Sequence, residues 1–264
     1  MTILEEQLII NKLNRTNSKT MNEQTTIDKM RMLRLKAMAD LYDRSHKENL
    51  YKDYTADELL ALMLDTEWEY RQQDKITNLI ARAGFKEIPS MQNIDYKSKR
   101  GLDRNTFERL LGLNFLKHKE NIIFTGLTGT GKSHLAQCIG IQACRLLQKT
   151  MFFKIGHLLE KAKLAKIEGN YMRWINIVGK CSLLIIDDFG TVPIDQQGRN
   201  VLLEIIDQRY ETASTIITSQ IPVSGWHTLI GEATIADAIL DRLVYSSHRV
   251  ELDGESLRKK KILD

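Results

Sequence analysis

Apolar residues in the first hundred positions recur at the spacing of amphipathic helices. One segment starts near Ile27, and its apolar positions are Met30, Leu33, Leu35, Met38, Leu41 and Tyr42. A second segment starts at Thr55, which forms a capping-box pattern with Glu58, and it ends at Gly84. No strand-like alternation interrupts this half of the sequence. The pattern therefore predicts a small all-helical N-terminal domain.

The second half of the chain has a different pattern, in which short β-branched apolar runs alternate with segments of helical length. The runs are Asn121–Thr125, Met151–Ile155, Leu183–Asp187, Thr215–Ser219 and Arg249–Leu252. Helical patterns fill the gaps, for example over 134–147 and 200–210, and a short helix is expected over 105–116. Such alternation is typical of a parallel sheet with crossover helices. We therefore expect an α/β core with a five-stranded parallel sheet and flanking helices.

A break in the helical pattern separates the two halves, between Pro89 and about Arg104, and it is basic through Lys97, Lys99 and Arg100. We place the domain boundary at the end of this linker. Residues 1–104 then form a helical domain with a basic linker, which is expected to make partner and self contacts. Residues 105–264 form the α/β core.

The composition is that of a soluble globular protein, with 42% hydrophobic and 27% charged positions among 264 residues. No apolar run approaches the roughly 20 residues that cross a bilayer, so no membrane partner is expected. The cysteines Cys138, Cys144 and Cys181 lack metal-ligand spacing and are expected to be reduced core thiols of a cytoplasmic protein. A formal net charge of +4 permits a nucleic-acid partner without arguing for one.

One motif matches the phosphate-binding P-loop pattern, and its residues are Gly126, Leu127, Thr128, Gly129, Thr130, Gly131, Lys132 and Ser133. The glycines let backbone N–H groups turn toward phosphate oxygens, and the following helix adds the positive end of its dipole. Lys132 supplies a mobile positive charge, and Ser133 supplies a hydroxyl for Mg²⁺. His134 comes next, and its ring either lies near the nucleotide or packs in the core. The motif stands between a predicted strand and an apolar helix, so we expect ATP and Mg²⁺ as cofactors.

A second element agrees with the first, because the buried run from Leu183 ends in two acids, Asp187 and Asp188. An acid at the carboxyl end of a parallel strand projects into the crevice where ligands bind. We expect Asp187 to hold Mg²⁺ together with Ser133, and Asp188 to orient the attacking water. The alternative is an ordinary turn after a strand. The order of the motifs favours a hydrolytic P-loop ATPase over a small-molecule kinase.

Beyond these motifs the sequence resembles the IstB transposition helper ATPases, which are AAA+ proteins related to the DnaC helicase loader. The likeness is carried by Leu183–Gly190, Arg209–Glu211, Ile217–Gln220, Asp241–Leu243 and Gly254–Arg258. It covers the chain from about Thr26 and is most specific from Gly126 onward. The resemblance implies an AAA+ core, binding of duplex DNA without strong sequence preference, and partnership with the transposase encoded by the same element.

The resemblance also implies roles for single residues in the core. Ser219 would take a sensor position at the end of the fourth strand, where many AAA+ proteins have Asn, and Gln220 is the alternative. Arg242 would be an arginine finger that reaches the ATP of a neighbouring subunit. A plain ion pair of Arg242 with Asp237 or Asp241 is the alternative to that role. Where the family commonly has Glu, this chain has the shorter Asp188, so slow hydrolysis is expected.

The end of the chain adds two expectations. Only about a dozen residues follow the last predicted strand, which leaves no room for the C-terminal helical lid of most AAA+ proteins. The ATP crevice would then be closed by the next subunit, so a homo-oligomer is expected. Arg258 near this end would be a second sensor residue or part of an exposed basic tail.

Three basic clusters are candidates for contacts with DNA phosphates, which give salt-dependent and sequence-tolerant binding. They are Lys161, Lys163, Lys166 and Arg173 between the second and third strands; Lys97, Lys99, Arg100 and Arg104 in the linker; and Arg258–Lys261 in the tail. A solvated charged surface is the alternative for each cluster. Tyr171 and Trp174 beside the first cluster are expected to pack in the core rather than stack on bases.

Together these features predict an ATP-dependent, DNA-binding helper of a transposase, with Lys132, Asp187, Asp188, Ser219 and Arg242 as its catalytic residues. ATP would be held between subunits and hydrolysed to regulate transposition. Two alternatives stay open at this point. One is a helicase loader of the DnaC type, and the other is a nucleotide-gated scaffold that hardly hydrolyses ATP.

Overall fold

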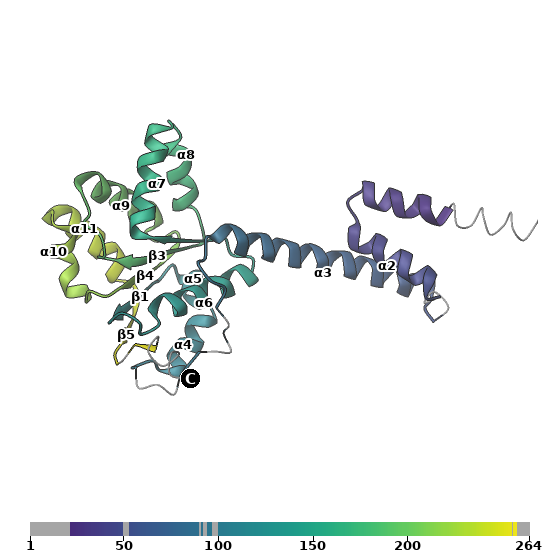
Figure 1. Cartoon of the computed structure of the whole chain (residues 1–264), viewed down its shortest axis with the longest axis horizontal. Helices are drawn as coiled ribbons and strands as arrows, with labels where there is room; N and C mark the ends of the chain where they lie inside the picture. The colour runs from purple at the N-terminus through teal and green to yellow at the C-terminus, as the bar shows by residue number, and fades with distance from the viewer. Residues whose placement is uncertain are drawn as a thin grey trace, which may run out of the picture. The chain divides into compact units, whose positions relative to one another are not determined.

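The computed structural model describes residues 22–49, 53–89, 91, 94–96, 100–254 and 256–257. The chain divides into two compact units, Met1–Lys75 and Ile76–Asp264. We call them the N-terminal unit and the P-loop unit, and Figure 1 shows the elements of each. Lys97, Lys99 and the tail cluster Arg258–Lys261, named above as candidates, lie outside the described residues.

The N-terminal unit is helical, as predicted. It contains a helix over 22–32, then α2 (Lys36–Lys47) and the first part of the long helix α3 (Ala56–Ala83). The capping box at the start of α3 is confirmed. The backbone N–H of Thr55 donates to Glu58 Oε2 at 2.8 Å, and the Glu58 N–H donates to Thr55 Oγ1 at 3.3 Å. The Glu58 carboxylate also accepts from the Thr55 hydroxyl at 2.7 Å, and the hydrogen bonds from the Thr55 N–H and hydroxyl lower the pKa of this carboxyl from its ordinary value.

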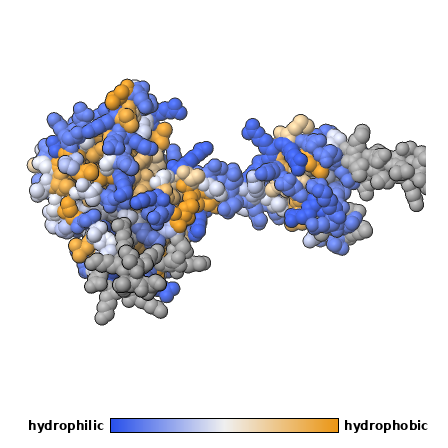
Figure 2. Space-filling model, in the orientation of Figure 1, coloured by the Kyte–Doolittle hydropathy of each residue, from blue (hydrophilic) through white to orange (hydrophobic). Residues whose placement is uncertain are grey.

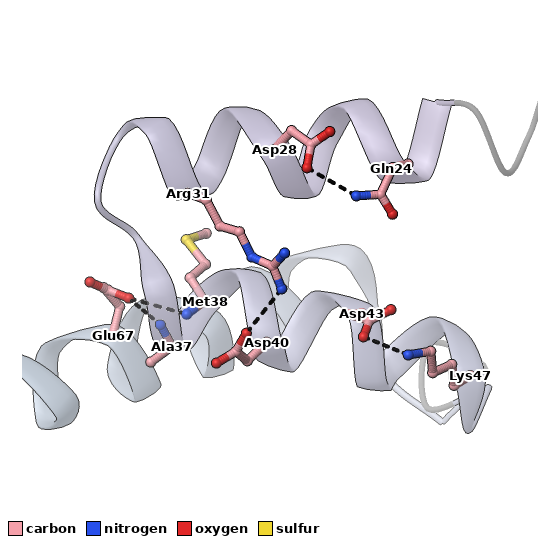
Figure 3. A network of polar contacts seen from close by, with 9 residues as sticks. All are labelled: Gln24, Asp28, Arg31, Ala37, Met38, Asp40, Asp43, Lys47 and Glu67. Atoms are coloured by element: carbon pink, nitrogen blue, oxygen red, sulfur yellow. Dashed lines mark hydrogen bonds and ion pairs between the residues drawn. The ribbon is translucent and has the colours of Figure 1, made fainter.

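The core of the N-terminal unit is small, and Met38, Leu41 and Met63 form its buried apolar cluster. A buried carboxylate supports it from α3 (Figure 3). Glu67 Oε2 accepts from the backbone N–H groups of Ala37 and Met38, at 2.9 and 3.1 Å. Glu67 thus satisfies N–H groups of the first turn of α2 that have no partner within the helix, as a capping side chain does. Arg71 Nε lies 2.8 Å from Glu67 Oε1 and balances the charge.

The P-loop unit is built on a five-stranded parallel sheet in the order β2-β3-β4-β1-β5. The strands are β1 (Asn121–Gly126), β2 (Thr150–Lys154), β3 (Leu183–Phe189), β4 (Ser214–Ser219) and β5 (Ser247–Leu252). Each lies within two residues of a run predicted from the sequence. The predicted α/β class and strand number are therefore confirmed. The continuous apolar runs reflect strands that are covered on both faces.

Successive residues of the strands enter different cores, because side chains alternate across a sheet. Ile123 and Ile186 join one buried cluster, whereas their neighbours Ile122 and Ile185 join another. The first cluster is covered by α7 (Ile155–Ile167), α8 (Tyr171–Gly179), α9 (Gln196–Arg209), α10 (Trp226–Ile230) and α11 (Ala233–Val244). The second is covered by α4 (Arg104–Leu111), α5 (Asn114–His118) and α6 (Lys132–Arg145). A short 3₁₀ turn, η3 (Val223–Gly225), precedes α10.

Two features differ from the sequence-based expectation. The helix expected over 105–116 is two helices, because Leu113 adopts a left-handed conformation with φ of 56° between them. Residues 76–104, assigned above to the first domain and its linker, belong to the compact P-loop unit. Ile94 is buried in its core and Phe85 packs against the same cluster. The partner-binding role assigned to residues 1–104 stays a prediction.

The three cysteines are buried and free, as predicted. Burial raises the pKa of the Cys138 thiol to about 11, which keeps it protonated at neutral pH. No helix in the described part of the chain is long and apolar enough to cross a membrane.

Candidate functional site

The phosphate loop follows β1, and three of its glycines have backbone conformations that side chains rarely adopt. Gly126, Gly129 and Gly131 have φ values of 136°, 81° and 95°. A Cβ atom added at Gly126 would lie 1.9 Å from the carbonyl oxygen of Leu252 on β5. Glycine is therefore required for the loop to leave β1 so close to the neighbouring strand. The loop ends where α6 begins, with the helix N-terminus facing it.

Lys132, the first residue of α6, turns back into the loop. Its side chain is 7% exposed, and Nζ donates to the carbonyl oxygens of Gly126 and Leu127, both at 2.7 Å. Thr130 Oγ1 donates to the same Leu127 carbonyl at 2.9 Å and closes the loop from its other side. The Lys132 ammonium is thus held inside the glycine-rich loop by backbone carbonyls, which a ligand's oxygen atoms can replace. Phosphate oxygens are stronger acceptors for such a group.

The two acids at the end of β3 have different surroundings. Asp187 is 3% exposed and accepts a hydrogen bond from Thr218 Oγ1 at 2.5 Å. The Thr218 hydroxyl in turn accepts from the backbone N–H of Asp188 at 3.1 Å. Asp188 has a left-handed φ of 57°, and its Oδ2 lies 2.5 Å from Nζ of Lys154 at the end of β2. The strand register explains this, because Lys154 is the β2 partner of Asp187.

The loop and the two acids line one pocket of about 430 Å³. Of the predicted binding residues, those that line it are Thr128, Gly129, Gly131, Lys132, Ser133, His134, Asp187 and Asp188. Among the other residues that line the pocket are Lys86, Glu87, Pro89, Ile94, Asp95, Arg100, Lys154, Gln220 and Leu257. Its volume lies within the usual range of about 300–1,000 Å³ for ligand sites. The structure therefore brings the phosphate loop and the two acids, which the sequence singled out as separate motifs, into one pocket.

The donors and acceptors of this pocket fit a nucleotide phosphate chain with a Mg²⁺ ion. Ser133 and Asp187 offer a hydroxyl and a carboxylate, which are the hard oxygen ligands that Mg²⁺ prefers. Among the described residues no group of three or more His, Cys, Asp or Glu side chains stands ready to hold a metal. A site with two protein ligands suits Mg²⁺, which keeps several waters and binds substrate phosphates.

Ser219 lies at the end of β4, but its hydroxyl is engaged by the backbone. The side chain is fully buried, Oγ donates to the Phe189 carbonyl at 2.7 Å, and it accepts from the Ile221 N–H at 3.0 Å. The next residue, Gln220, is the one that lines the pocket. Thr218, which contacts Asp187 directly, was missed from the sequence. Thr218 reaches Asp187 because β4 pairs with β3, and this pairing cannot be recognised from a single sequence.

Arg242 lies on α11, at the other end of the sheet from the phosphate loop. Its Nη2 lies 3.0 Å from Asp207 Oδ1, and its Nη1 donates to the Ala238 carbonyl at 2.8 Å. It lines a separate pocket of about 260 Å³, which also includes Asn121 at the start of β1. Arg242 therefore does not reach the nucleotide pocket of its own chain. Its carboxylate partner is Asp207, and neither Asp237 nor Asp241 forms an ion pair with it in the described structure.

The basic cluster between β2 and β3 is in part engaged within the protein. Lys163 Nζ lies 2.9 Å from Asp195 Oδ2, and Lys166 Nζ lies 4.7 Å from the centre of the Tyr171 ring. Tyr171 and Trp174 pack against the core, as expected. Desolvation and its hydrogen bond to Glu204 raise the pKa of the Tyr171 hydroxyl.

Arg100 was predicted to belong to a basic surface, and this is wrong. Its side chain is 3% exposed, because it folds onto the phosphate loop and donates from Nη1 to the Thr130 carbonyl at 2.9 Å. Arg209, part of a segment that carries the resemblance, is also buried and 2% exposed. Its guanidinium donates to the carbonyls of Val178, Gly179 and Cys181 and so closes the end of α8.

Comparison with known proteins places these features in a family. Residues 28–264 match the family model described as IstB-like ATP binding protein. The putative insertion sequence ATP-binding protein y4pL of Sinorhizobium fredii (strain NBRC 101917 / NGR234) is 39% identical over 234 residues, 89% of this chain and 96% of that protein. The putative ATP-binding protein of insertion sequence IS232 from Bacillus thuringiensis subsp. berliner is 32% identical over 228 residues, 86% of this chain and 91% of that protein.

Solved structures agree with the fold. AMPPCP-bound DnaA from Aquifex aeolicus aligns with a TM-score of 0.54 and 19% sequence identity, over 68% of this chain and 56% of that chain. At this identity the likeness shows the fold alone, which is that of the AAA+ proteins.

Proposed function

This chain belongs to the family of IstB-like ATP binding proteins, and from that premise we propose that its pocket binds ATP with Mg²⁺ and hydrolyses the terminal phosphate. One observation carries the proposal. Lys132, Ser133, Asp187 and Asp188, which come from two separate motifs, line a single pocket around a glycine-rich loop. Positive charge, backbone N–H groups and oxygen ligands for a metal are features by which P-loop enzymes position and stabilise the phosphates in phosphoryl transfer.

Each residue has a separate task in this proposal. Lys132 exchanges the carbonyls of Gly126 and Leu127 for phosphate oxygens when the substrate binds. Ser133 and Asp187 would hold Mg²⁺, which would supply positive charge against the phosphate oxygens. Asp188 orients the attacking water, and it does so only when it leaves the ion pair with Lys154.

Arg242 completes the site of a neighbouring subunit in this proposal. Its place at the far end of the sheet keeps it from its own nucleotide, so a second copy of the chain must supply the arginine. Arginine suits this task because its planar guanidinium stays charged and meets phosphate oxygens with two parallel hydrogen bonds. Asp207 and the Tyr210 ring, whose centre is 5.8 Å from Arg242 Cζ, hold the side chain until such an assembly forms. The active species is therefore a homo-oligomer.

The assembly is proposed to act on duplex DNA in the cytoplasm, as helper of a transposase encoded by the same insertion sequence. The support is the insertion-sequence association in the names of the relatives. The turn between α7 and α8 is the surface we propose for DNA. Basic Lys166 and Arg173 flank it, together with apolar Ile167 and Met172, which are 81% and 64% exposed. Figure 2 shows apolar surface at this end of the P-loop unit, among hydrophilic residues.

A second candidate function is a nucleotide-gated scaffold that hydrolyses ATP slowly. The ion pair between Lys154 and Asp188 favours it, because a carboxylate that is held by an ammonium is not free to polarise water. The two candidates differ in turnover and not in ATP binding.

Titration with a fluorescent ATP analogue tests the binding step. Lys132→Ala should weaken binding about tenfold or more, because hydrogen bonds to charged groups contribute about 1.5–3 kcal/mol and 1.4 kcal/mol is a factor of ten. Lys180→Ala, at an exposed position outside the pocket, is the control and should bind as the wild type does. Equal affinity of Lys132→Ala and the wild type would sink the assignment of the site.

A further inference from the structure

Arg100 joins the phosphate loop to the end of the sheet, and nothing in the P-loop motif accounts for it. Its Nη1 donates to the Thr130 carbonyl at 2.9 Å, and its own carbonyl accepts from the backbone N–H of Asp253 at 2.9 Å. The side chain is 3% exposed and lines the same pocket as Lys132. It comes from a segment that precedes the sheet in sequence, 30 residues before its partner in the loop.

The guanidinium of Arg100 is a buried charge that the protein compensates only in part. Its Nε atom is buried and has no hydrogen-bond partner among the described residues. Burial lowers the pKa of the Arg100 side chain, while the charges of Asp95 and Tyr96 act in the opposite direction. A buried charge is costly unless other groups compensate it. A phosphate chain in the pocket is a compensating group of the right sign.

The contact also bears on the geometry of the loop. Nη1 lies 2.5 Å from the position that a Cβ atom would take at Gly131, so the guanidinium packs directly against the start of α6. The carbonyl of Thr130 and the N–H of Gly131 belong to one planar trans peptide group, in which they point in opposite directions. A hydrogen bond that holds the carbonyl therefore also sets the direction of the Gly131 N–H.

We propose that Arg100 is a positioning residue of the nucleotide site, which aligns the Thr130–Gly131 peptide and supplies a buried positive charge that strengthens binding of the phosphate chain. This inference rests on the proposed function of the pocket. It adds a residue that stands outside the P-loop motif. It also identifies the polyphosphate, and not the base, as the part of the ligand on which Arg100 acts.

The inference is tested with two probes, a fluorescently labelled ATP analogue and inorganic triphosphate. The affinity for each probe is measured by titration with the full-length protein. The variants are Arg100→Met, which removes charge and donors, and Arg100→Lys, which keeps the charge but loses the fork. Arg199→Met is a matched control. Arg199 also donates to backbone carbonyls, those of Ile194 and Ile230. Its buried Nε likewise has no hydrogen-bond partner within the described part of the chain, but Arg199 lies outside the pocket.

Arg100→Met should weaken both probes to the same extent, by about tenfold or more, because each loses the same charged neighbour. Arg100→Lys should recover part of the affinity, and Arg199→Met should bind both probes within about twofold of the wild type. If Arg100 had only a structural role, its replacement would lower the melting temperature of the free protein, but probe affinity would not depend on the charge at position 100. Arg100→Met protein that is folded and binds both probes as tightly as the wild type overturns the inference.

If Arg100→Met does not fold, Arg100→Gln replaces it, since glutamine keeps a donor for the Thr130 carbonyl but has no charge. Tighter binding by Arg100→Lys than by Arg100→Gln supports the proposal, and equal or reversed affinities overturn it. The proposed function fails in a different way, if the wild type and Lys132→Ala bind the ATP analogue equally. Loss of binding in Lys132→Ala with full binding in Arg100→Met refutes only the role of Arg100.

Discussion

The ion pair between Lys154 and Asp188 allows a quantitative prediction about catalysis. Lys154→Met keeps the length and the apolar part of the side chain but removes the ammonium that lies 2.5 Å from Asp188 Oδ2. In the proposed mechanism Asp188 orients the attacking water, so its carboxylate must first leave this partner. The variant should therefore hydrolyse ATP faster than the wild type in the absence of DNA.

The size of the effect follows from the exposure of the pair. The side chains of Lys154 and Asp188 are 41% and 29% exposed, so solvent screens their attraction. Exposed pairs contribute about 0.2–1 kcal/mol in measured cases, and we take the upper end because this pair is partly buried. A difference of about 1 kcal/mol corresponds to roughly a fivefold increase in the fraction of Asp188 that is free. Turnover should rise by about the same factor if release of Asp188 limits the rate.

Steady-state hydrolysis, measured as kcat and KM for ATP without DNA, checks the prediction. Lys47→Met is the matched control, because Lys47 pairs with Asp43 at 2.7 Å on α2 of the N-terminal unit and neither residue lines the pocket. The double variant Lys154→Met with Asp188→Asn should show no gain, since the released group is absent. A lower kcat in Lys154→Met, or a raised KM with unchanged kcat, would refute the reasoning and give Lys154 a role in holding substrate.

Two further predictions concern the Asp187 contact and the shared site. Thr218→Val keeps the shape of the side chain but removes the hydroxyl between Asp187 and the Asp188 N–H. It should lower the free energy of unfolding, measured with urea, by about 1–3 kcal/mol. It should also weaken the Mg²⁺-dependent part of ATP binding, measured by titration. Unchanged values for both would contradict this role of Thr218. Arg242→Ala should bind ATP normally but lose DNA-stimulated hydrolysis, and mixing it with Lys132→Ala should restore part of the activity. A mixture that co-assembles and stays inactive would show that Arg242 is not supplied in trans.

Several features of this protein depend on residues that are close together in the chain, so they could be predicted from the sequence alone. The P-loop residues from Gly126 to Ser133 are contiguous, so their pattern can be recognised in the sequence without knowledge of the fold. The capping box of Thr55 and Glu58 acts within one helical turn. The parallel sheet was visible because strands covered on both faces are apolar along their whole length, and crossover helices separate them.

Contacts between distant segments were decided by the tertiary structure. Thr218 meets Asp187, and Lys154 meets Asp188, only because β3 pairs with β4 on one side and β2 on the other. Arg100 was assigned to a basic linker because the sequence shows its charge. The sequence does not show that the side chain is buried against the Thr130 carbonyl. A charged residue has the same appearance in a sequence whether it faces water or a phosphate loop. The difference lies in which segments the fold brings together, and for these residues only the tertiary structure decides it.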